Sequence, residues 1–270
     1  MIKLWDDNKI PYYNKEYQDG FMPSITPYIV ENAKTCILIC PGGGYRTVCT
    51  DHEGVQIANY LNKLGISAFM LEYRIAPYKH PTEITDAKRA MRYVRYLAKE
   101  YGYDKHKIGA MGFSAGGHLA GCLGVFDSDF GYEPQDEIDK ESSKPDFLIL
   151  CYPALSLCQY AHRGTFVNLS QDLSNDAAVR LSVEKNVSET TPPTFLFHTI
   201  GDCDVPVENS ILMAKALSRH KVKFELHTYT HGMHGVALCD RDFQEEKVKK
   251  YTSFWKKNLL NWLRSMNYLD

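Results

Sequence analysis

Ser114 stands between two glycines, in the order Gly112-Phe113-Ser114-Ala115-Gly116. A serine hydroxyl becomes a nucleophile when a histidine accepts its proton and a carboxylate orients that histidine. The pattern Gly-x-Ser-x-Gly is typical of a serine held on a sharp turn between a strand and a helix. Neither glycine carries a Cβ, which relieves crowding where the backbone turns. The same pattern also occurs in ordinary glycine-rich turns, so the prediction depends on the partners that the rest of the chain supplies.

Three consecutive glycines end an early apolar run, in the stretch "CPGGGY" (40–45). Backbone N–H groups of glycine can approach a developing oxyanion because no side chain stands in the way. We predict that the donors are the amides of Gly43, Gly44 and Ala115, the last directly after the serine. Tyr45 is expected to wall off the acyl side and to leave room for little more than a methyl group. The alternative is that the three glycines form only a flexible turn.

A serine nucleophile of this type is followed along the chain first by an acid and then by a histidine. The acid lies in "TIGDCDVP" (199–206), as Asp202 or Asp204, and the base in "THGMHGVAL" (230–238), as His231 or His234. Both stretches are predicted loops after strands, and their spacing leaves the choice within each pair open. Four histidines in predicted helices, strands or irregular chain are interpreted as structural side chains: His118, His162, His198 and His227.

Short apolar runs alternate with longer helical patterns, and these elements must position the candidate residues. The predicted strands cover 35–40, 67–74, 107–113, 145–153, 194–200 and 223–230. The predicted helices cover 54–65, 85–102, 114 to about 125, 207–219 and 240–264. Such alternation predicts an α/β fold with a mostly parallel central sheet and helices on both faces. The loops with the acid and the base should then lie at the sheet edge that carries Ser114.

The 270 residues are predicted to form a single domain, 1–270, since α/β folds of this length are often undivided. Residues 154–192 break the alternation, because they contain much Ser, Asn and Asp with only weak periodicity. A segment of this length between core elements is often a lid or cap over a site. We therefore expect an insertion of this kind around 154–192.

Composition argues against several partners. The formal net charge is −2 and no sustained basic block occurs, so neither nucleic acid nor an anionic membrane surface is expected. No apolar run of about 18 residues predicts a spanning helix. The N-terminus lacks the apolar stretch of a signal peptide, which favours a cytoplasmic location. The eight cysteines form no C-x-x-C pair, so free thiols are expected in place of a zinc site, and no metal or cofactor is predicted.

The stretches "PGGGY", "GFSAGGHLA", "HTIGDCDVPVENS" and "GMHGVAL" resemble the α/β-hydrolase esterases of the acetyl-esterase, hormone-sensitive-lipase-like type. The resemblance covers about residues 35 to 265 and is closest to the branch that deacetylates xylan-derived sugars. In that branch the acid heads a D-x-x-V-P run and the base lies in G-x-H-G, which implies Asp202 and His234. The sequence departs from the family at Pro41, where a histidine often precedes the glycines and helps to brace their loop.

The resemblance implies a serine carboxylester hydrolase that needs no cofactor and acts on a small-molecule ester. Acetyl groups on sugars or xylo-oligosaccharides are the expected substrates, with Ser114 as nucleophile, His234 as base and Asp202 as orienting acid. One alternative is a peptidase of the prolyl-oligopeptidase type, although the chain lacks room for the propeller domain of that class. The other is a non-catalytic binding protein on an esterase scaffold, which commonly loses a triad member. The sequence leaves the oligomeric state open, with a homodimer as one expectation.

Overall fold

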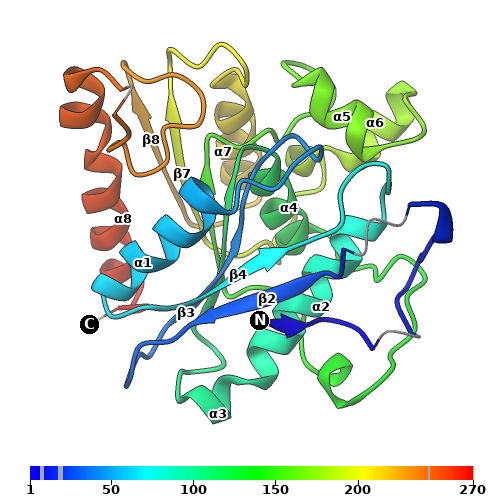
Figure 1. The fold of residues 1–270 in the computed structure, drawn as a ribbon. Helices are drawn as coiled ribbons and strands as arrows, with labels where there is room; N and C mark the ends of the chain where they lie inside the picture. Colours follow the sequence, from blue (N-terminus) through cyan, green and yellow to red (C-terminus); the bar gives the residue numbers. More distant parts are fainter. Residues whose placement is uncertain (7–8, 18–20, 243, 270) are drawn as a thin grey trace.

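The computed structural model describes residues 1–6, 9–17, 21–242 and 244–269 (Figure 1). Its centre is an eight-stranded sheet with the strand order β1-β2-β4-β3-β5-β6-β7-β8. The strands are β1 (Ile2–Lys3), β2 (Ser24–Tyr28), β3 (Cys36–Cys40), β4 (Ser67–Glu72), β5 (Ile108–Phe113), β6 (Phe147–Cys151), β7 (Thr194–Thr199) and β8 (Phe224–Tyr229). The strands from β3 to β8 pair in parallel, whereas β2 pairs antiparallel with β1 and β4. The predicted α/β class with a mostly parallel sheet is confirmed.

Helices cover both faces of this sheet (Figure 1). They are α1 (Gln56–Lys63), α2 (Thr82–Tyr96), α3 (Ala98–Tyr101), α4 (Ser114–Val125), α5 (Arg163–Leu169), α6 (Asn175–Leu181), α7 (Glu208–Arg219) and α8 (Phe254–Ser265). Successive side chains of a strand point to opposite faces. Leu38 of β3 accordingly belongs to the core cluster that contains side chains of α2, α4 and α7, whereas Ile37 and Ile39 belong to the cluster that contains side chains of α1 and α8. Strands buried on both faces explain the continuous apolar runs in the sequence.

Several boundaries differ from the predicted ones. The chain is already helical before α1, as a π-helical turn over Asp51–Val55, and α2 begins at Thr82, directly after Pro81. The pattern expected over 240–264 contains a π-helical turn, Val248–Thr252, before α8. The antiparallel strands β1 and β2 were not predicted, because β2 is short, half-buried and carries Pro27 inside the strand.

The strand order changes direction at β3, which has β4 on one side and β5 on the other. Ligands of open α/β sheets bind at the carboxyl ends of the strands beside such a switch point. Here the three glycines follow β3 and Ser114 follows β5, so these two loops are neighbours. Asp202 follows β7 and His234 follows β8, at the same edge of the sheet.

Residues 154–192 contain α5, α6 and a short 3-10 turn, Val183–Lys185. Figure 1 shows α5 and α6 side by side beyond the sheet. Their periodicity is weak, but each helix has an N-cap: the His162 ring accepts from the Thr165 amide, and Ser174 Oγ accepts from the Ala177 amide at 3.1 Å. Elsewhere in the described parts of the chain, too, every helix is too short or too polar to cross a bilayer.

Candidate active site

Ser114 occupies a strained turn that only its glycine neighbours make possible. The residue is the first of α4, directly after β5, and its φ is 52°. A Cβ on Gly116 would lie 2.1 Å from the Cys40 carbonyl oxygen, and one on Gly112 would lie 2.1 Å from the Gly116 oxygen. Positive φ at a residue with a side chain costs of order 1–3 kcal/mol and clusters at functional sites. The turn presents the serine at the carboxyl edge of the sheet.

The structure brings Ser114, His234 and Asp202 together in one hydrogen-bonded row. His234 Nε2 lies 2.7 Å from Ser114 Oγ, and His234 Nδ1 lies 2.7 Å from Asp202 Oδ2. These are the contacts by which a histidine accepts the proton of a serine while a carboxylate fixes its tautomer. Of the two pairs that the sequence left open, Asp202 and His234 are the members that contact each other.

Asp202 is buried and its carboxylate is fully engaged. Its Oδ1 accepts from the amides of Asp204 at 3.0 Å and Val205 at 2.9 Å, and its Oδ2 also lies 3.4 Å from His198 Nε2. Burial raises the pKa of Asp202, but hydrogen bonds from His198 and His234 lower it more, so that the pKa lies well below its usual range. The carboxylate is therefore ionised at neutral pH, as an orienting acid must be.

The pKa of His234 responds to opposing influences. Burial lowers it, whereas the hydrogen bond and charge of Asp202 and the charges of Glu53 and Asp204 raise it. The net result is a pKa above the ordinary value for histidine. A group that accepts and returns a proton near neutral pH needs a pKa in this region.

The glycine loop after β3 turns through backbone conformations that favour glycine, with φ of 127° at Gly43 and 64° at Gly44. The Gly42 amide donates to Glu53 at 2.9 Å, but the amides of Gly43 and Gly44 have no acceptor among the described residues. The Ala115 amide lies in the first turn of α4, where N–H groups lack intrahelical acceptors. The three predicted oxyanion donors are thus available for a ligand.

A cavity of about 510 Å³ opens beside Ser114. Most of its lining comes from the glycine loop, the base loop and α5, and it combines several polar side chains with a larger apolar surface. The lining residues are Gly43, Gly44, Arg46, Cys49, His52, Glu53, Ser114, His162, Gly164, Asn168, Asp204, His234 and Gly235.

Tyr45 does not belong to this lining, and the prediction that it walls off the acyl side is wrong. Its φ of 56° turns the side chain into the core, where the ring is 1% exposed. The phenol oxygen lies 2.9 Å from His118 Nδ1, and the two rings pack edge to face. Tyr45 therefore anchors the glycine loop from behind.

Four side chains around the site have roles that were not predicted from the sequence. His198 contacts Asp202, and Glu53 binds the glycine loop. No local sequence pattern predicts either role. His162 and Asn168 reach the cavity from 154–192, and Asn168 Nδ2 donates to the Gly44 carbonyl at 2.8 Å. The polar composition of that segment was the one available signal.

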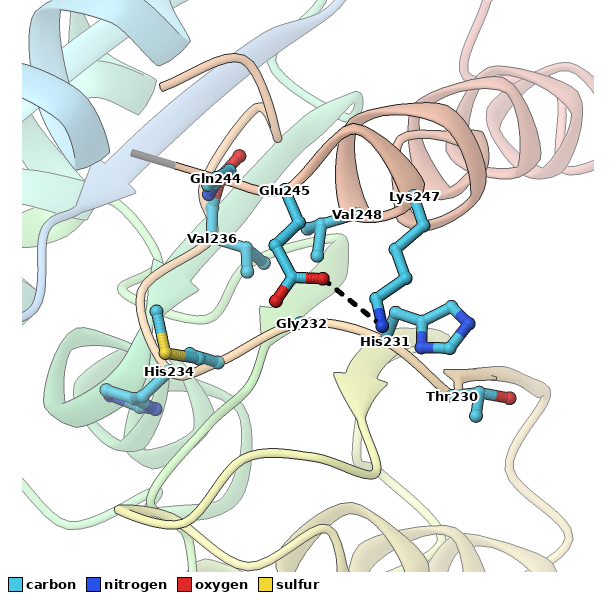
Figure 2. A pocket seen from close by; sticks show the side chains of 10 residues that line it. Thr230, His231, Gly232, His234, Val236, Gln244, Glu245, Lys247 and Val248 are labelled. Atoms are coloured by element: carbon cyan, nitrogen blue, oxygen red, sulfur yellow. Dashed lines mark hydrogen bonds and ion pairs between the residues drawn. The ribbon is translucent and has the colours of Figure 1, made fainter. Parts of the chain in front are cut away.

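His231 faces a different space. A second cavity, of about 260 Å³, shares His234 with the first and is otherwise lined by residues 230–233, 236, 244, 245, 247 and 248 (Figure 2). Figure 2 shows His231 beside Lys247, which pairs with Glu245 at 3.2 Å, while His234 lies at the far side. The His231 carbonyl accepts from Thr252, which holds this residue away from Ser114.

Cys49, His52 and Glu53 have ligand atoms within 4.8 Å of one another at the cavity wall, a spacing that a metal ion could bridge. Both Glu53 oxygens already accept hydrogen bonds, from the Gly42 amide at 2.9 Å and the Tyr152 hydroxyl at 2.8 Å. Acyl transfer by a serine, a histidine and an aspartate uses protein groups alone.

The BD-FAE family model matches residues 25–217. The chain belongs to the BD-FAE family. Among curated proteins, this BD-FAE chain is 34% identical over 249 residues to endo-1,4-beta-xylanase B of Butyrivibrio fibrisolvens, covering 89% of the chain and 38% of that protein. It is 31% identical over 232 residues to the acetylxylan esterase of Xylanibacter ruminicola, covering 84% and 44%. The chain thus spans less than half the length of these two relatives.

Among solved structures, the BD-FAE chain is similar to the acetyl ester-xyloside bifunctional hydrolase of Caldicellulosiruptor lactoaceticus. The TM-score is 0.91 at 41% sequence identity, over 100% of this chain and 97% of that one. The resemblance to acetyl-esterase-type α/β hydrolases is thereby confirmed.

Proposed function

We propose that the chain is a serine carboxylester hydrolase that removes short acyl groups, acetyl above all, from sugar hydroxyls. Ser114 attacks the ester carbonyl while His234 takes its proton, and Asp202 stabilises the imidazolium that forms. The amides of Gly43, Gly44 and Ala115 hold the tetrahedral oxyanion. His234 then protonates the departing sugar oxygen. A water molecule, activated by the same histidine, releases the acid and restores the serine.

One observation carries this proposal: the two 2.7 Å contacts that place His234 between Ser114 and Asp202. A histidine with this pair of partners can act as base and then as acid without moving. The strained serine turn supports the same reaction, and so do the amides of Gly43 and Gly44, which have no acceptor within the described part of the chain, because an oxyanion needs donors that are already in place.

The substrate class is inferred from the relatives and from the cavity. One of the similar proteins is named an acetylxylan esterase and another an acetyl ester-xyloside bifunctional hydrolase. The side chains of Arg46, His52, His162 and Asn168 line the cavity and offer hydrogen bonds to sugar hydroxyls, which a long acyl chain could not use. These polar groups are the reason for proposing acetylated xylo-oligosaccharides in preference to lipids as substrates.

We further propose that residues 154–192 act as a cap within a single domain. Three residues of this segment line the cavity, and the Asn168 bond to the Gly44 carbonyl joins α5 to the glycine loop. Lys79 Nζ adds a bond to the Val167 carbonyl at 2.7 Å. A cytoplasmic location and a homodimeric assembly remain predictions from the sequence.

The test compares kcat/KM for nitrophenyl acetate, butyrate and octanoate, for acetylated xylo-oligosaccharides and for a peptide amide. Acetate should exceed butyrate, which has two more methylenes, by about tenfold or more, since a pocket discriminates by about 1–3 kcal/mol per methylene. Preference for octanoate would contradict the short-acyl proposal, and faster turnover of the peptide would favour a peptidase. A fluorophosphonate that labels the wild-type chain but not Ser114→Ala separates an enzyme from a binding protein.

A further inference from the structure

Glu53 is a carboxylate buried beside the triad, and the mechanism above does not use it. It lies on the π-helical turn before α1, is 3% exposed and lines the same cavity as Ser114 and His234. One oxygen accepts from the Gly42 amide at 2.9 Å and the other from the Tyr152 hydroxyl at 2.8 Å. These donors belong to two different loops, after β3 and after β6. Glu53 therefore joins parts of the site that are far apart in the chain.

Tyr152 continues this connection to the loop of the base. Its hydroxyl oxygen accepts from the Ala237 amide at 3.1 Å, and its ring packs edge to face on His234, with centroids 5.2 Å apart. Trp255 donates to the Ala237 carbonyl at 3.1 Å, so the same residue is held through both its amide and its carbonyl. An unbroken row of hydrogen bonds thus runs from Gly42 through Glu53 and Tyr152 to Ala237.

The Gly42 amide and the Tyr152 hydroxyl explain why position 53 carries a carboxylate. An N–H group and an O–H group point at the two oxygens, so both positions must accept. A glutamine could accept at only one of them and would turn its NH₂ group toward the other donor. Burying a charge is costly unless it is hydrogen-bonded, and this site supplies the bonds. The Glu53 carboxylate can therefore influence the neighbouring reaction in two ways, by accepting both hydrogen bonds and by its negative charge.

We propose that Glu53 is a positioning residue. It holds the glycine loop in place relative to His234, and its charge stabilises the protonated imidazole during acyl transfer. The first role acts through the Gly42 amide, which precedes the oxyanion donors Gly43 and Gly44. The second role acts through space on the base. The inference rests on the proposed roles of Ser114 and His234.

The charge of Glu53 is one of several that face the base. The charged and titratable groups that contact His234 or act on its pKa are Asp202, Asp204, Glu53, His162 and the Tyr152 phenol, and Arg46, Cys49 and His52 line the same cavity. The charges of Asp202, Glu53 and Asp204 raise the pKa of His234, whereas a protonated His162 opposes its protonation. Neutralising Glu53 should accordingly lower the pKa of His234 while Asp202 keeps its hydrogen bond.

The test measures kcat/KM for nitrophenyl acetate from pH 5 to 9 in Glu53→Gln, with Tyr152→Phe as the matched control. Because Glu53→Gln misplaces one acceptor, kcat/KM should fall about tenfold or more. Because it also removes the charge, the midpoint of the acid limb of the pH profile, where activity rises with pH, should move down by roughly half a pH unit or more. Tyr152→Phe removes the hydroxyl but keeps the charge. It should lower kcat/KM without moving that midpoint down.

An acid limb in Glu53→Gln that coincides with wild type would overturn the electrostatic role, and kcat/KM within twofold of wild type would overturn the positioning role. If Glu53→Gln does not fold, Glu53→Asp keeps the charge but retracts the carboxylate. It should lose activity with the midpoint unchanged, and full activity would refute the inference. Ser114→Ala is measured alongside: if it stays active, the proposed function itself has failed, whereas an inactive Ser114→Ala with unaffected Glu53 variants overturns only the role of Glu53.

Discussion

Exchanging Asp202 for asparagine is the sharpest single test of the triad, because it alters one atom and leaves the volume unchanged. The carboxylate holds two sets of partners: the amides of Asp204 and Val205 on Oδ1, and His234 Nδ1 on Oδ2. An asparagine can keep both amide bonds only by placing its carbonyl oxygen there. Its NH₂ group then faces His234 Nδ1, which can no longer be a donor.

This geometry determines the size of the effect. Against an NH₂ group the imidazole must carry its proton on Nε2, the atom 2.7 Å from Ser114 Oγ. A protonated Nε2 cannot take the serine proton, so the base is present in the wrong tautomer. Tautomer reversal of this kind lowers kcat by about 10³–10⁴, which corresponds to about 4–5.5 kcal/mol of transition-state stabilisation. The opposite orientation of the asparagine amide is unfavourable, because it would place the NH₂ group against the backbone N–H groups of Asp204 and Val205, with no acceptor between them.

The assay is kcat for nitrophenyl acetate in Asp202→Asn and Asp204→Asn, with melting temperatures of both. Asp204 lines the cavity, and its amide, not its side chain, binds Asp202. Asp204→Asn should therefore keep activity within about tenfold of wild type, since it removes only a nearby charge. An Asp204→Asn loss larger than that of Asp202→Asn would refute the reasoning and move the acid to Asp204.

Four further predictions concern the same site. Ser114→Ala should lower kcat by at least about 10³ with an unchanged fold by circular dichroism, and more than a tenth of wild-type activity would exclude this nucleophile. Activity should rise with pH as His234 loses its proton, and because its pKa is raised, the midpoint should lie above the ordinary value near 6.5. His234→Ala should abolish turnover and this limb, while His231→Ala keeps both; the reverse pattern would exchange their roles. Gly116→Ala should sharply lower the melting temperature, since its Cβ would lie 2.1 Å from the Cys40 carbonyl oxygen, and an unchanged value would argue against so tight a turn.

The sequence predicted the parts of the site that depend on local pattern. Ser114 follows an apolar run and precedes small residues, and such a pattern specifies a strand, a turn and a helix without knowledge of distant residues. Asp202 and His234 each follow a strand of the same parallel sheet, so topology alone brings their loops to one edge. The choice against Asp204 and His231 came from the family resemblance.

Contacts between distant segments could not be predicted in this way. The direction of the Tyr45 side chain depends on its φ of 56°, and the glycines before it give no sign of that value. Glu53 and Tyr152 are 99 residues apart, and Asn168 and Gly44 are 124 apart. Each pair is set by how the loops pack, whereas sequence periodicity reports only which face of an element is buried.

Pro41 illustrates how packing replaces a missing side chain. The family often has a histidine here to brace the glycine loop, and in this chain the carbonyls of the loop are braced one by one. The Pro41 oxygen accepts from the Tyr73 hydroxyl at 2.7 Å, and the Gly42 oxygen accepts from the Cys49 amide at 3.0 Å. The Gly43 oxygen accepts from the amides of residues 46 and 47.

These carbonyl bonds also orient the amides that the reaction needs. In a trans peptide the C=O and the N–H of the next residue point in opposite directions within one plane. Fixing the Gly42 carbonyl on the Cys49 amide therefore fixes the direction of the Gly43 N–H, and fixing the Gly43 carbonyl does the same for the Gly44 N–H. Both residues line the cavity beside Ser114. The donors are thus held in place before an ester binds, which is the condition under which they stabilise an oxyanion without further reorganisation.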